Sequence, residues 1–528
     1  MLWHPARRQG RPPEGGQESH SHFSVIIPIL AKLIDLYSFG AGGLRKLRIS
    51  AFWLISSALL VTCGGSGSQS GTKTSGITYR AFLTNTVGTP GVYIVDAQHD
   101  VHPNGLNPIS AGRSPGMMVV TPNRAQTLVF SGYNTENPDY QFSIINNISE
   151  TNAAHVTLPG PTESFVVSPD SSVAYIAVPN APVVGESQGA ILLLGVFGAN
   201  VGLPQGQVNI PSVRYLAVNN GGDRILAFSS NADTTDAPCS TTTPCFLFVV
   251  TPSNIGTGNS VVTPIPSVAT NNSLDHPVAA FFSSDDTMAF VVNCGAECGG
   301  TQASLQPFDM TTNTPGTPAP VPAASEALVD GSTVYLAGTP YSDGSPSQPC
   351  TGQTTAAPTC GVLTILNLNT MQPIQPPNCP TGQQCPVIIT DGYHNRISMG
   401  ANGQLFIGAR TCSEIAPPAP SQQAGEVRGC LSIYNTLTTS AGNVPPGGVT
   451  IPPVNGDVTG IQPIAARSVV YVVQGYIVPG GSLYIYCATT DVDANCPVAD
   501  AIQTAPINEP TYAPLMNGNF YDVKGVDF

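Results

Sequence analysis

One pattern of apolar runs and polar turns recurs along the chain after residue 76. Each copy has a short apolar run, a turn of Pro, Asn, Asp or Gly and a second apolar run, as in Glu163-SFVVSPDSSVAYIAVP-Asn180. The runs are rich in Val, Phe, Ile and Tyr, which predicts buried strands, and Asx and Gly at the turns favour the left-handed geometry of tight hairpins. The copies are residues 116–133, 163–180, 213–231, 277–294, 325–339, 395–410 and 459–475.

Further apolar runs lie between the copies, at residues 141–147, 190–197, 245–251, 362–368 and 431–436. Each unit therefore predicts four short strands, and helix-period patterns are nearly absent after residue 76. Four short strands repeated at a period of tens of residues are typical of a β-propeller blade. We therefore predict an all-β propeller over residues 78–528.

The two ends of this region indicate how the ring closes. Residues 78–98 resemble the second half of a blade, and the tail Tyr521–Phe528 resembles the start of the last copy, Asp457–Ile461. Pairing of the N- and C-terminal strands would remove both free sheet edges. Eight units would give about 56 residues each, within the usual range for such repeats. The sequence thus favours eight blades, and seven blades with the tail as a loose strap is the alternative.

The motif at residues 165–180 is an apolar strand, Ser-Pro-Asp, a second apolar strand and Asn. This motif resembles the YVTN family of propeller repeats, which also occur in lactonase-like propellers. The resemblance covers most of residues 78–528. It implies the fold and says little about function, because one scaffold hosts many activities.

The N-terminal part has the pattern of an export signal. Arg45, Lys46 and Arg48 precede an apolar run, Ile49–Thr62, and a Gly/Ser-rich stretch follows it. Such a run is typical of a secretory signal and is shorter than the roughly 20 residues that span a bilayer. We divide the chain into a leader (residues 1–62, an N-terminal extension plus signal peptide), a linker (63–77) and the propeller (78–528).

Residues 60–63, Leu-Val-Thr-Cys, resemble the lipobox of bacterial lipoproteins. Thr62 departs from the usual Gly, Ala or Ser at its place. The resemblance implies cleavage before Cys63 and a lipid on that cysteine, which would tether the propeller to a membrane. An uncleaved membrane anchor is the alternative.

The remaining cysteines form neighbouring pairs in chain order, and each pair closes a short loop rich in Gly, Pro, Thr or Ser. An even set plus one odd cysteine at the lipobox fits an exported lipoprotein, and local disulfides are the simplest pairing. The spacing of Cys294 and Cys298 also occurs in zinc sites, but no second ligand pair lies nearby. The disulfide candidates are Cys239, Cys245, Cys294, Cys298, Cys350, Cys360, Cys379, Cys385, Cys412, Cys430, Cys487 and Cys496.

Composition excludes several classes of protein. Charged residues are 9% of the chain and hydrophobic residues 41%, whereas a disordered chain needs much charge and few apolar groups. The net charge of −14 argues against a nucleic-acid partner, because phosphates need Lys and Arg opposite them. Trp3 and Trp53 both fall in the leader, which disfavours quinoprotein dehydrogenases and sialidases with their Trp-containing repeats.

Four residues are candidates for the central channel. His276 and His394 precede predicted inner strands, and Glu163 and Arg214 enter blades at the corresponding place. Glu326 enters another blade in the same way. No constellation among them singles out a catalytic group.

Two further clusters have the residue types of metal sites. His99 and His102 lie with Asp96 and Asp100 in one loop, for which a polar surface loop is the preferred interpretation. Residues 491–495 imitate the start of a calcium loop but lack its later Gly and Glu. We assign no metal and no cofactor.

These observations favour a lipid-anchored, non-catalytic β-propeller of the bacterial cell envelope, on the periplasmic or outer-membrane side. Its partner would be an envelope protein or a glycan. The alternative is a lactonase-like hydrolase with a site at the mouth of the central channel, which would need acidic and basic groups converging there.

Overall fold

The structure is a computed structural model that describes residues 74–528, apart from 134–137, 235–237, 268–273, 341–359, 378, 382–384, 386, 401–402, 413–429, 438–445, 453–455, 465–466, 476–480 and 488–515. The leader, Cys63, most of the linker, Cys350, Cys496 and the calcium-like residues 491–495 therefore lie outside the described residues. Within that part of the chain, no helix is long and apolar enough to cross a membrane.

The described elements are short strands and three single 3₁₀ turns. The first half of the chain holds β1 (Arg80–Asn85), β2 (Gly91–Asp96), β3 (Pro115–Val120), β4 (Gln126–Ser131), β5 (Gln141–Asn146), β6 (Thr151–Thr157), β7 (Ser164–Val167), β8 (Val173–Val178), β9 (Ala190–Gly195), η1 (Gly198–Asn200), β10 (Pro204–Asn209), β11 (Val213–Val218), β12 (Ile225–Asp233), β13 (Cys245–Val250), η2 (Pro252–Asn254) and β14 (Val262–Pro266). The second half holds β15 (Pro277–Phe282), β16 (Met288–Asn293), η3 (Gly295–Cys298), β17 (Ser304–Asp309), β18 (Thr314–Pro315), β19 (Ala319–Pro320), β20 (Glu326–Asp330), β21 (Thr333–Gly338), β22 (Gly361–Asn367), β23 (Gln372–Pro373), β24 (Val387–Ile389), β25 (Tyr393–Met399), β26 (Gln404–Arg410), β27 (Leu431–Asn435), β28 (Val449–Thr450), β29 (Asp457–Ile464), β30 (Val469–Gly475), β31 (Gly481–Cys487) and β32 (Met516–Gly525).

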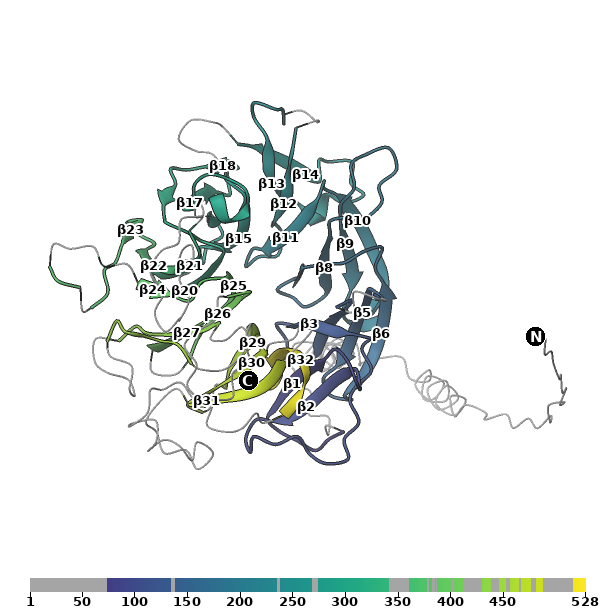
Figure 1. The fold of residues 1–528 in the computed structure, drawn as a ribbon. Coiled ribbons are helices and arrows are strands. Elements are labelled where there is room, and N and C mark those ends of the chain that lie inside the picture. Colours follow the sequence, from purple (N-terminus) through teal and green to yellow (C-terminus); the bar gives the residue numbers. More distant parts are fainter. Residues whose placement is uncertain are drawn as a thin grey trace, which may run out of the picture. The chain divides into compact units, whose positions relative to one another are not determined.

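The strands form seven antiparallel sheets arranged as a ring, which confirms the predicted β-propeller (Figure 1). Four sheets have four strands each, paired in chain order. They begin with β3, β7, β11 and β25. The sheets that begin with β15 and β20 each add a fifth short strand, β19 or β24, at the outer edge. The innermost strands line the centre of the ring, and each contacts the innermost strand of the neighbouring unit.

The favoured count of eight blades is wrong, because the ring has seven sheets. The units expected to be seventh and eighth share one six-stranded sheet, in the order β2-β1-β32-β31-β30-β29. They merge because β32 pairs with β31 on one side, at Gly481–Phe520 and Leu483–Met516, and with β1 on the other. Seven is the number of blades in the alternative prediction, but the C-terminal tail forms a paired strand, β32, and not a loose strap.

Short polar side chains stabilise the turns of the inner hairpins by hydrogen bonding. In the β7–β8 turn, the Asp170 carboxylate accepts hydrogen bonds from the Ser172 main-chain N–H at 3.0 Å and from the Ser168 hydroxyl at 2.5 Å. Ser283 and Asp285 repeat this arrangement between β15 and β16. The left-handed residue is the one after the Asx, such as Ser171 with φ of 62°. The Asx side chain therefore fixes the turn by hydrogen bonding.

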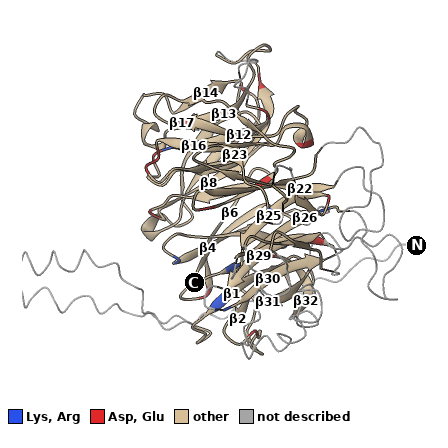
Figure 2. Cartoon of the chain, turned by 90° about the vertical axis from the view of Figure 1, so that its left-hand side faces the viewer, with Lys and Arg blue, Asp and Glu red and all other residues tan. Residues whose placement is uncertain are grey.

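The hydrophobic core lies between neighbouring sheets and not in one central mass. Phe142 of β5 meets Phe165 of β7 edge to face at 5.0 Å between ring centres, and both are buried. Comparable clusters fill the other inter-sheet spaces. Charged positions are sparse over the described strands, as Figure 2 shows. Each blade is therefore held mainly by apolar packing against its two neighbours.

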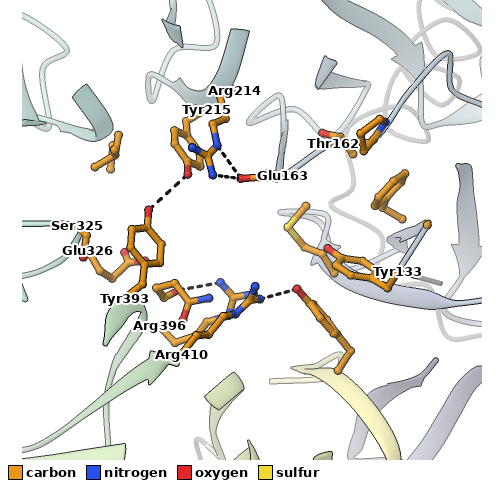
Figure 3. Close-up of a pocket in the computed structure, with 18 residues that line it drawn as sticks. Tyr133, Thr162, Glu163, Arg214, Tyr215, Ser325, Glu326, Tyr393, Arg396 and Arg410 are labelled. Carbon is orange, nitrogen blue, oxygen red and sulfur yellow. Dashed lines mark hydrogen bonds and ion pairs between the residues drawn. The ribbon is translucent and has the colours of Figure 1, made fainter. Parts of the chain in front are cut away.

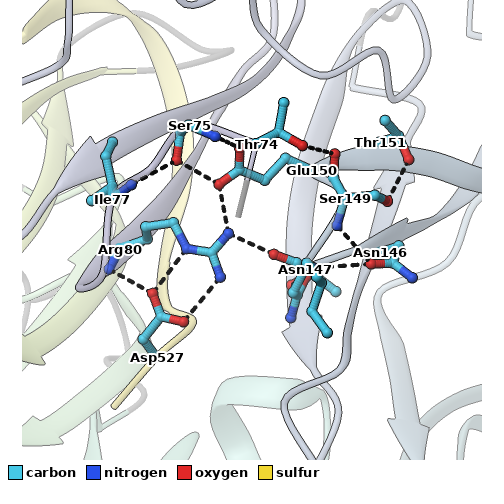
Figure 4. Close-up of polar contacts among 12 residues, drawn as sticks. Thr74, Ser75, Ile77, Arg80, Asn146, Asn147, Ser149, Glu150, Thr151 and Asp527 are labelled. Carbon is cyan, nitrogen blue, oxygen red and sulfur yellow. Dashed lines mark hydrogen bonds and ion pairs between the residues drawn. The ribbon is translucent and has the colours of Figure 1, made fainter. Parts of the chain in front are cut away.

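The ring closes where the two ends of the propeller meet. β1 pairs with β32 from Ala81–Gly525 to Asn85–Phe520, which confirms the predicted pairing of terminal strands. The Arg80 guanidinium, 1% exposed, binds both oxygens of Asp527 at 2.8 and 2.9 Å and Glu150 at 2.6 Å (Figure 4). Glu150 also accepts a hydrogen bond from the Ser75 hydroxyl. This cluster, which we call the clasp (Arg80, Asp527 and Glu150), joins three separate segments of the chain.

The predicted disulfides are confirmed for four pairs: Cys239–Cys245, Cys294–Cys298, Cys379–Cys385 and Cys412–Cys430. Cys360 is also disulfide-bonded. Cys487 ends β31, and its side chain lies outside the described part. Disulfides persist in oxidising compartments, so these pairs support an exported protein.

The clasp predicts a large effect of a single terminal substitution. Asp527→Ala should lower the free energy of unfolding by about 3–5 kcal/mol, because it leaves the buried Arg80 guanidinium short of one carboxylate. Urea denaturation followed by circular dichroism measures this change. Glu186→Ala, an exposed carboxylate on a loop, is the control and should stay within about 0.5 kcal/mol of the parent. Equal stability of the two variants would contradict a structural role for the clasp.

Candidate functional site

A cavity of about 470 Å³ lies at the centre of the ring, at the end where most inner strands begin. Its volume is within the range of small-ligand pockets, about 300–1,000 Å³. Figure 3 shows its side chains converging from several blades. The lining residues are Met117, Phe130, Gly132, Tyr133, Pro161, Thr162, Glu163, Arg214, Tyr215, Val278, Ala279, Ser325, Glu326, Tyr393, Asn395, Arg396, Arg410 and Tyr521.

Irregular pairing at the start of the inner strands aims several of these side chains. The register shifts between Val213 and Tyr215 in β11, and again between His394 and Arg396 in β25. The residues inside these shifts, Arg214 and Asn395, both line the cavity. A β-bulge breaks the alternation of faces along a strand and re-aims its side chains. The bulges thus place polar groups on the cavity in strands that are otherwise largely apolar.

One wall carries an ion pair. Arg214 binds the Glu163 carboxylate at 2.7 Å through two of its nitrogens, and both side chains are well exposed. The Arg214 guanidinium also lies 5.0 Å from the centre of the Tyr215 ring. The hydroxyls of Tyr215 and Tyr393 are 3.5 Å apart across the cavity margin. Burial raises the pKa of both tyrosines, so both hydroxyls stay protonated and able to donate at neutral pH.

The opposite wall holds two arginines from one hairpin. Arg396 of β25 donates to the main-chain oxygens of Thr459 at 2.8 Å and Asn395 at 2.7 Å. Arg410 of β26 donates to the Tyr521 hydroxyl, and its guanidinium lies over the ring of that tyrosine. Among the described residues, neither guanidinium has a carboxylate within 4 Å. Both cations are therefore held by neutral groups only.

An aromatic surface adjoins these arginines. The rings of Tyr133 and Tyr521 lie 4.0 Å apart between centres. Gly116 makes room for the first, because a Cβ there would come within 2.1 Å of the Tyr133 ring. Burial raises the pKa of Tyr133 well above its usual value, so this hydroxyl too remains a donor.

Glu326 is the second carboxylate of the cavity. Burial raises its pKa, and the positive charge of Arg396 partly opposes that rise. Nearby, the Asn395 side-chain oxygen and the Arg410 Nε are buried without a hydrogen-bond partner in the described structure. A buried polar atom without a partner is costly, and a bound ligand can supply the missing partner.

The structure brings together two of the four residues expected to face the channel. Glu163 and Arg214 line the cavity as a pair. His394 is fully buried behind it, and its neighbours in β25 line the cavity instead. His276 packs against the Phe246 ring and binds the Asp275 carboxylate at 3.0 Å, outside the cavity lining. Glu326, from the same reasoning, does line it.

The loop with two histidines and two aspartates has other partners. His99 binds Asp96 at 2.8 Å and is exposed, whereas His102 contacts the Ile94 main-chain oxygen. The Arg467 guanidinium donates hydrogen bonds to both carboxylate oxygens of Asp100, at 2.6 and 2.7 Å. Among the described residues no group of three or more His, Cys, Asp or Glu is placed to hold a metal.

Sequence reasoning missed Tyr133, Tyr393, Arg396, Arg410 and Tyr521. A signal was present, because Tyr133 and Arg410 end the copies at residues 116–133 and 395–410. In an antiparallel hairpin the end of the second strand lies beside the start of the first. The last residues of the copies therefore belong to the same end of the ring as Glu163 and Arg214.

The lining offers mainly the chemistry of binding groups. It has cationic, aromatic and hydroxyl groups around a space of small-molecule size, and it contains neither His nor Cys. Ser325, the one serine of the lining, donates to the main-chain oxygen of His394 at 3.0 Å. The carboxyl of Glu297, which is not itself a lining residue, also interacts with the Ser325 side chain, and burial raises the pKa of Glu297 to about 7.

No family model matches the chain, and none of the curated proteins matches it. Among solved structures it is similar to the hydrazine synthase of Kuenenia stuttgartiensis, with a TM-score of 0.44 and 11% identity over 74% of this chain and 99% of that one. It is also similar to the β-propeller domain of Cps50 (Swd1) from Myceliophteria thermophila, with a TM-score of 0.41 and 10% identity over 71% of this chain and 97% of that one.

The burial of His394 predicts a pH dependence of stability. Burial lowers its pKa to about 4, against about 6.5 in an unfolded chain. Its contribution is therefore present above pH 6.5 and lost as pH falls toward 4, by at most about 3 kcal/mol. In chemical denaturation from pH 7 to 4, His394→Leu should lose less stability than the parent. The matched control is His155→Leu, at an exposed position of β6. A parental pH profile in His394→Leu would contradict a buried, neutral histidine.

Proposed function

We propose that this chain is an exported, lipid-anchored and non-catalytic β-propeller of the bacterial cell envelope, which binds a glycan in its central cavity. The observation that carries the proposal is the lining itself. Four tyrosines and three arginines converge on one cavity of about 470 Å³, and the described lining contains neither His nor Cys. Export is supported by the disulfides, and the anchor rests on the lipobox-like sequence at Cys63.

A glycan fits this cavity better than the surface of a folded protein. A protein interface of standard size buries about 800 Å² on each partner, which a pocket of this volume does not offer. Tyrosine rings present flat apolar faces with a polar edge, which suits the mixed faces of a sugar ring. Arginine, asparagine and tyrosine side chains supply donors and acceptors for hydroxyl groups. A sugar unit at a chain end or on a flexible chain would enter such a space.

One observation favours the alternative of a lactonase-like hydrolase. Glu326 is a carboxyl group with a raised pKa that lies in a cavity with arginines, as a general acid would. Purified protein should be assayed with simple sugar lactones, beside Glu326→Gln. Turnover that this substitution abolishes would replace the binding proposal with the hydrolase. The binding proposal expects no turnover by either protein.

Binding to immobilised glycans tests the proposal directly. Labelled full-length mature protein should be retained by a subset of envelope glycans on an array. Tyr133→Ala should reduce retention at least tenfold, because it removes an aromatic face of the cavity. Phe197→Ala, an exposed aromatic on the loop after β9, is the matched control and should bind as the parent does. Absence of binding to neutral and acidic glycans alike would contradict the proposed function.

A further inference from the structure

We infer that the cavity is specific for an acidic glycan and holds one sugar carboxylate between Arg396 and Arg410. The inference deepens the proposed function and rests on it. It concerns which glycans bind and which two side chains select them.

The distribution of charge in the cavity points to an anion. Arg214 already has a carboxylate partner in Glu163, at 2.7 Å. Arg396 binds two main-chain oxygens, and Arg410 binds a tyrosine hydroxyl. The two arginines thus bring two positive charges into a partly buried site with neutral partners only. Such charges are costly unless paired, and an entering anion would supply the pair.

The nearest carboxyl groups do not supply that pair. Asp457, whose charge acts on Arg410, instead accepts the Thr411 main-chain N–H at 2.7 Å. Glu326 accepts the N–H of its neighbour Ala327 at 3.2 Å. Neither lies within 4 Å of a guanidinium nitrogen of Arg396 or Arg410. Both carboxyls accept hydrogen bonds from main-chain donors, so neither pairs directly with these two arginines of the cavity lining.

Two buried atoms without a hydrogen-bond partner belong to lining residues of this cavity. The Arg410 Nε–H is a buried donor without an acceptor, and Asn395 Oδ1 is a buried acceptor without a donor. A sugar acid offers both complements, since its carboxylate accepts and its adjacent hydroxyl donates. Arginine also matches a planar carboxylate with parallel N–H donors. The arrangement therefore suits a carboxylate that has a hydroxyl group close by.

The adjoining aromatic surface suits the sugar ring. The rings of Tyr133 and Tyr521 lie 4.0 Å apart between centres, with their planes inclined at 38°, and Tyr521 also contacts Arg410, so a sugar ring attached to the bound carboxylate would lie close to them. The lining also contains more arginines than glutamates, which favours an anion.

The decisive experiment compares two disaccharides that differ only in their acid groups. Isothermal titration of the parent protein at pH 7 and low salt should show binding of digalacturonate and at least tenfold weaker binding of the neutral galactobiose. Raising the salt concentration should weaken the first and leave the second nearly unchanged, because only the first has an ionic contribution. Galactobiose sulfate is a third probe, and tighter binding of it than of digalacturonate would overturn the carboxylate assignment.

Variants then locate the carboxylate. Arg396→Gln and Arg410→Gln should each lower the affinity for digalacturonate at least tenfold and that for galactobiose by a much smaller factor, because only the acid loses an ionic contact. Arg224→Gln, at a partly exposed arginine of the turn between β11 and β12 and outside the cavity lining, is the matched control and should bind both sugars as the parent does. If Arg410→Gln unfolds, Tyr521→Phe tests the same site, because it removes only the hydroxyl that holds Arg410.

The outcomes separate the inference from the proposed function. Equal affinity for the two disaccharides, or unchanged acid affinity in both arginine variants, would overturn the inference and leave a glycan-binding propeller standing. Binding of neither sugar, together with no retention on the glycan array, would overturn both.

Discussion

The pairing of the first strand with the last is the constraint on which the rest of the structure depends. A propeller cavity exists only if the ring of sheets is complete, and here β32, in the middle of the six-stranded sheet, contacts both β29 and β3. A hydrogen bond between β32 and the neighbouring strand β3 strengthens this closure. The fully buried Asp522 of β32 accepts the Met118 main-chain N–H of β3 at 2.9 Å. The clasp adds a buried ionic contact at the same junction.

The chain has few charges, and the structure concentrates them at particular places. Arg80 belongs to the clasp, and Arg467, in the β29–β30 turn, binds Asp100 in the loop after β2 of the same sheet. Arg214, Arg396 and Arg410 line the cavity. In a chain of net charge −14, a cavity with more arginines than carboxylates is a local reversal of sign. Such a reversal favours anions at one end of the ring while the molecule as a whole repels them. Closure of the ring and the arrangement of the cavity are thus physically linked, because Tyr521, which holds Arg410, belongs to the closing strand.

Much of the fold could be predicted because its determinants are local. The motif Ser168-Pro169-Asp170 specifies a hairpin through contacts within five residues, and the confirmed disulfides join cysteines close in sequence. Terminal pairing was predictable because the tail repeats the pattern of residues 457–461. The blade count was not, because the β31–β32 pairing that merges two units leaves no local signal.

The cavity could be predicted only in part. Glu163 and Arg214 follow from their place in the repeat. The prediction that His394 faces the channel was wrong. The irregular pairing after His394 decides which side chains of β25 face the cavity, and His394 itself is buried in the core. Arg396, Arg410 and Tyr521 come from different strands, and their meeting depends on the three-dimensional closure of the ring.

Native-state hydrogen exchange of the closing strands is the most direct test of this account. Amides of β1 (Arg80–Asn85) and of the β32 residues paired with it should exchange as slowly as those of a central strand such as β8, because they open only when the whole ring unfolds. Exchange of β1 and β32 several orders of magnitude faster than that of β8, under conditions where the other blades stay protected, would contradict closure by the two termini.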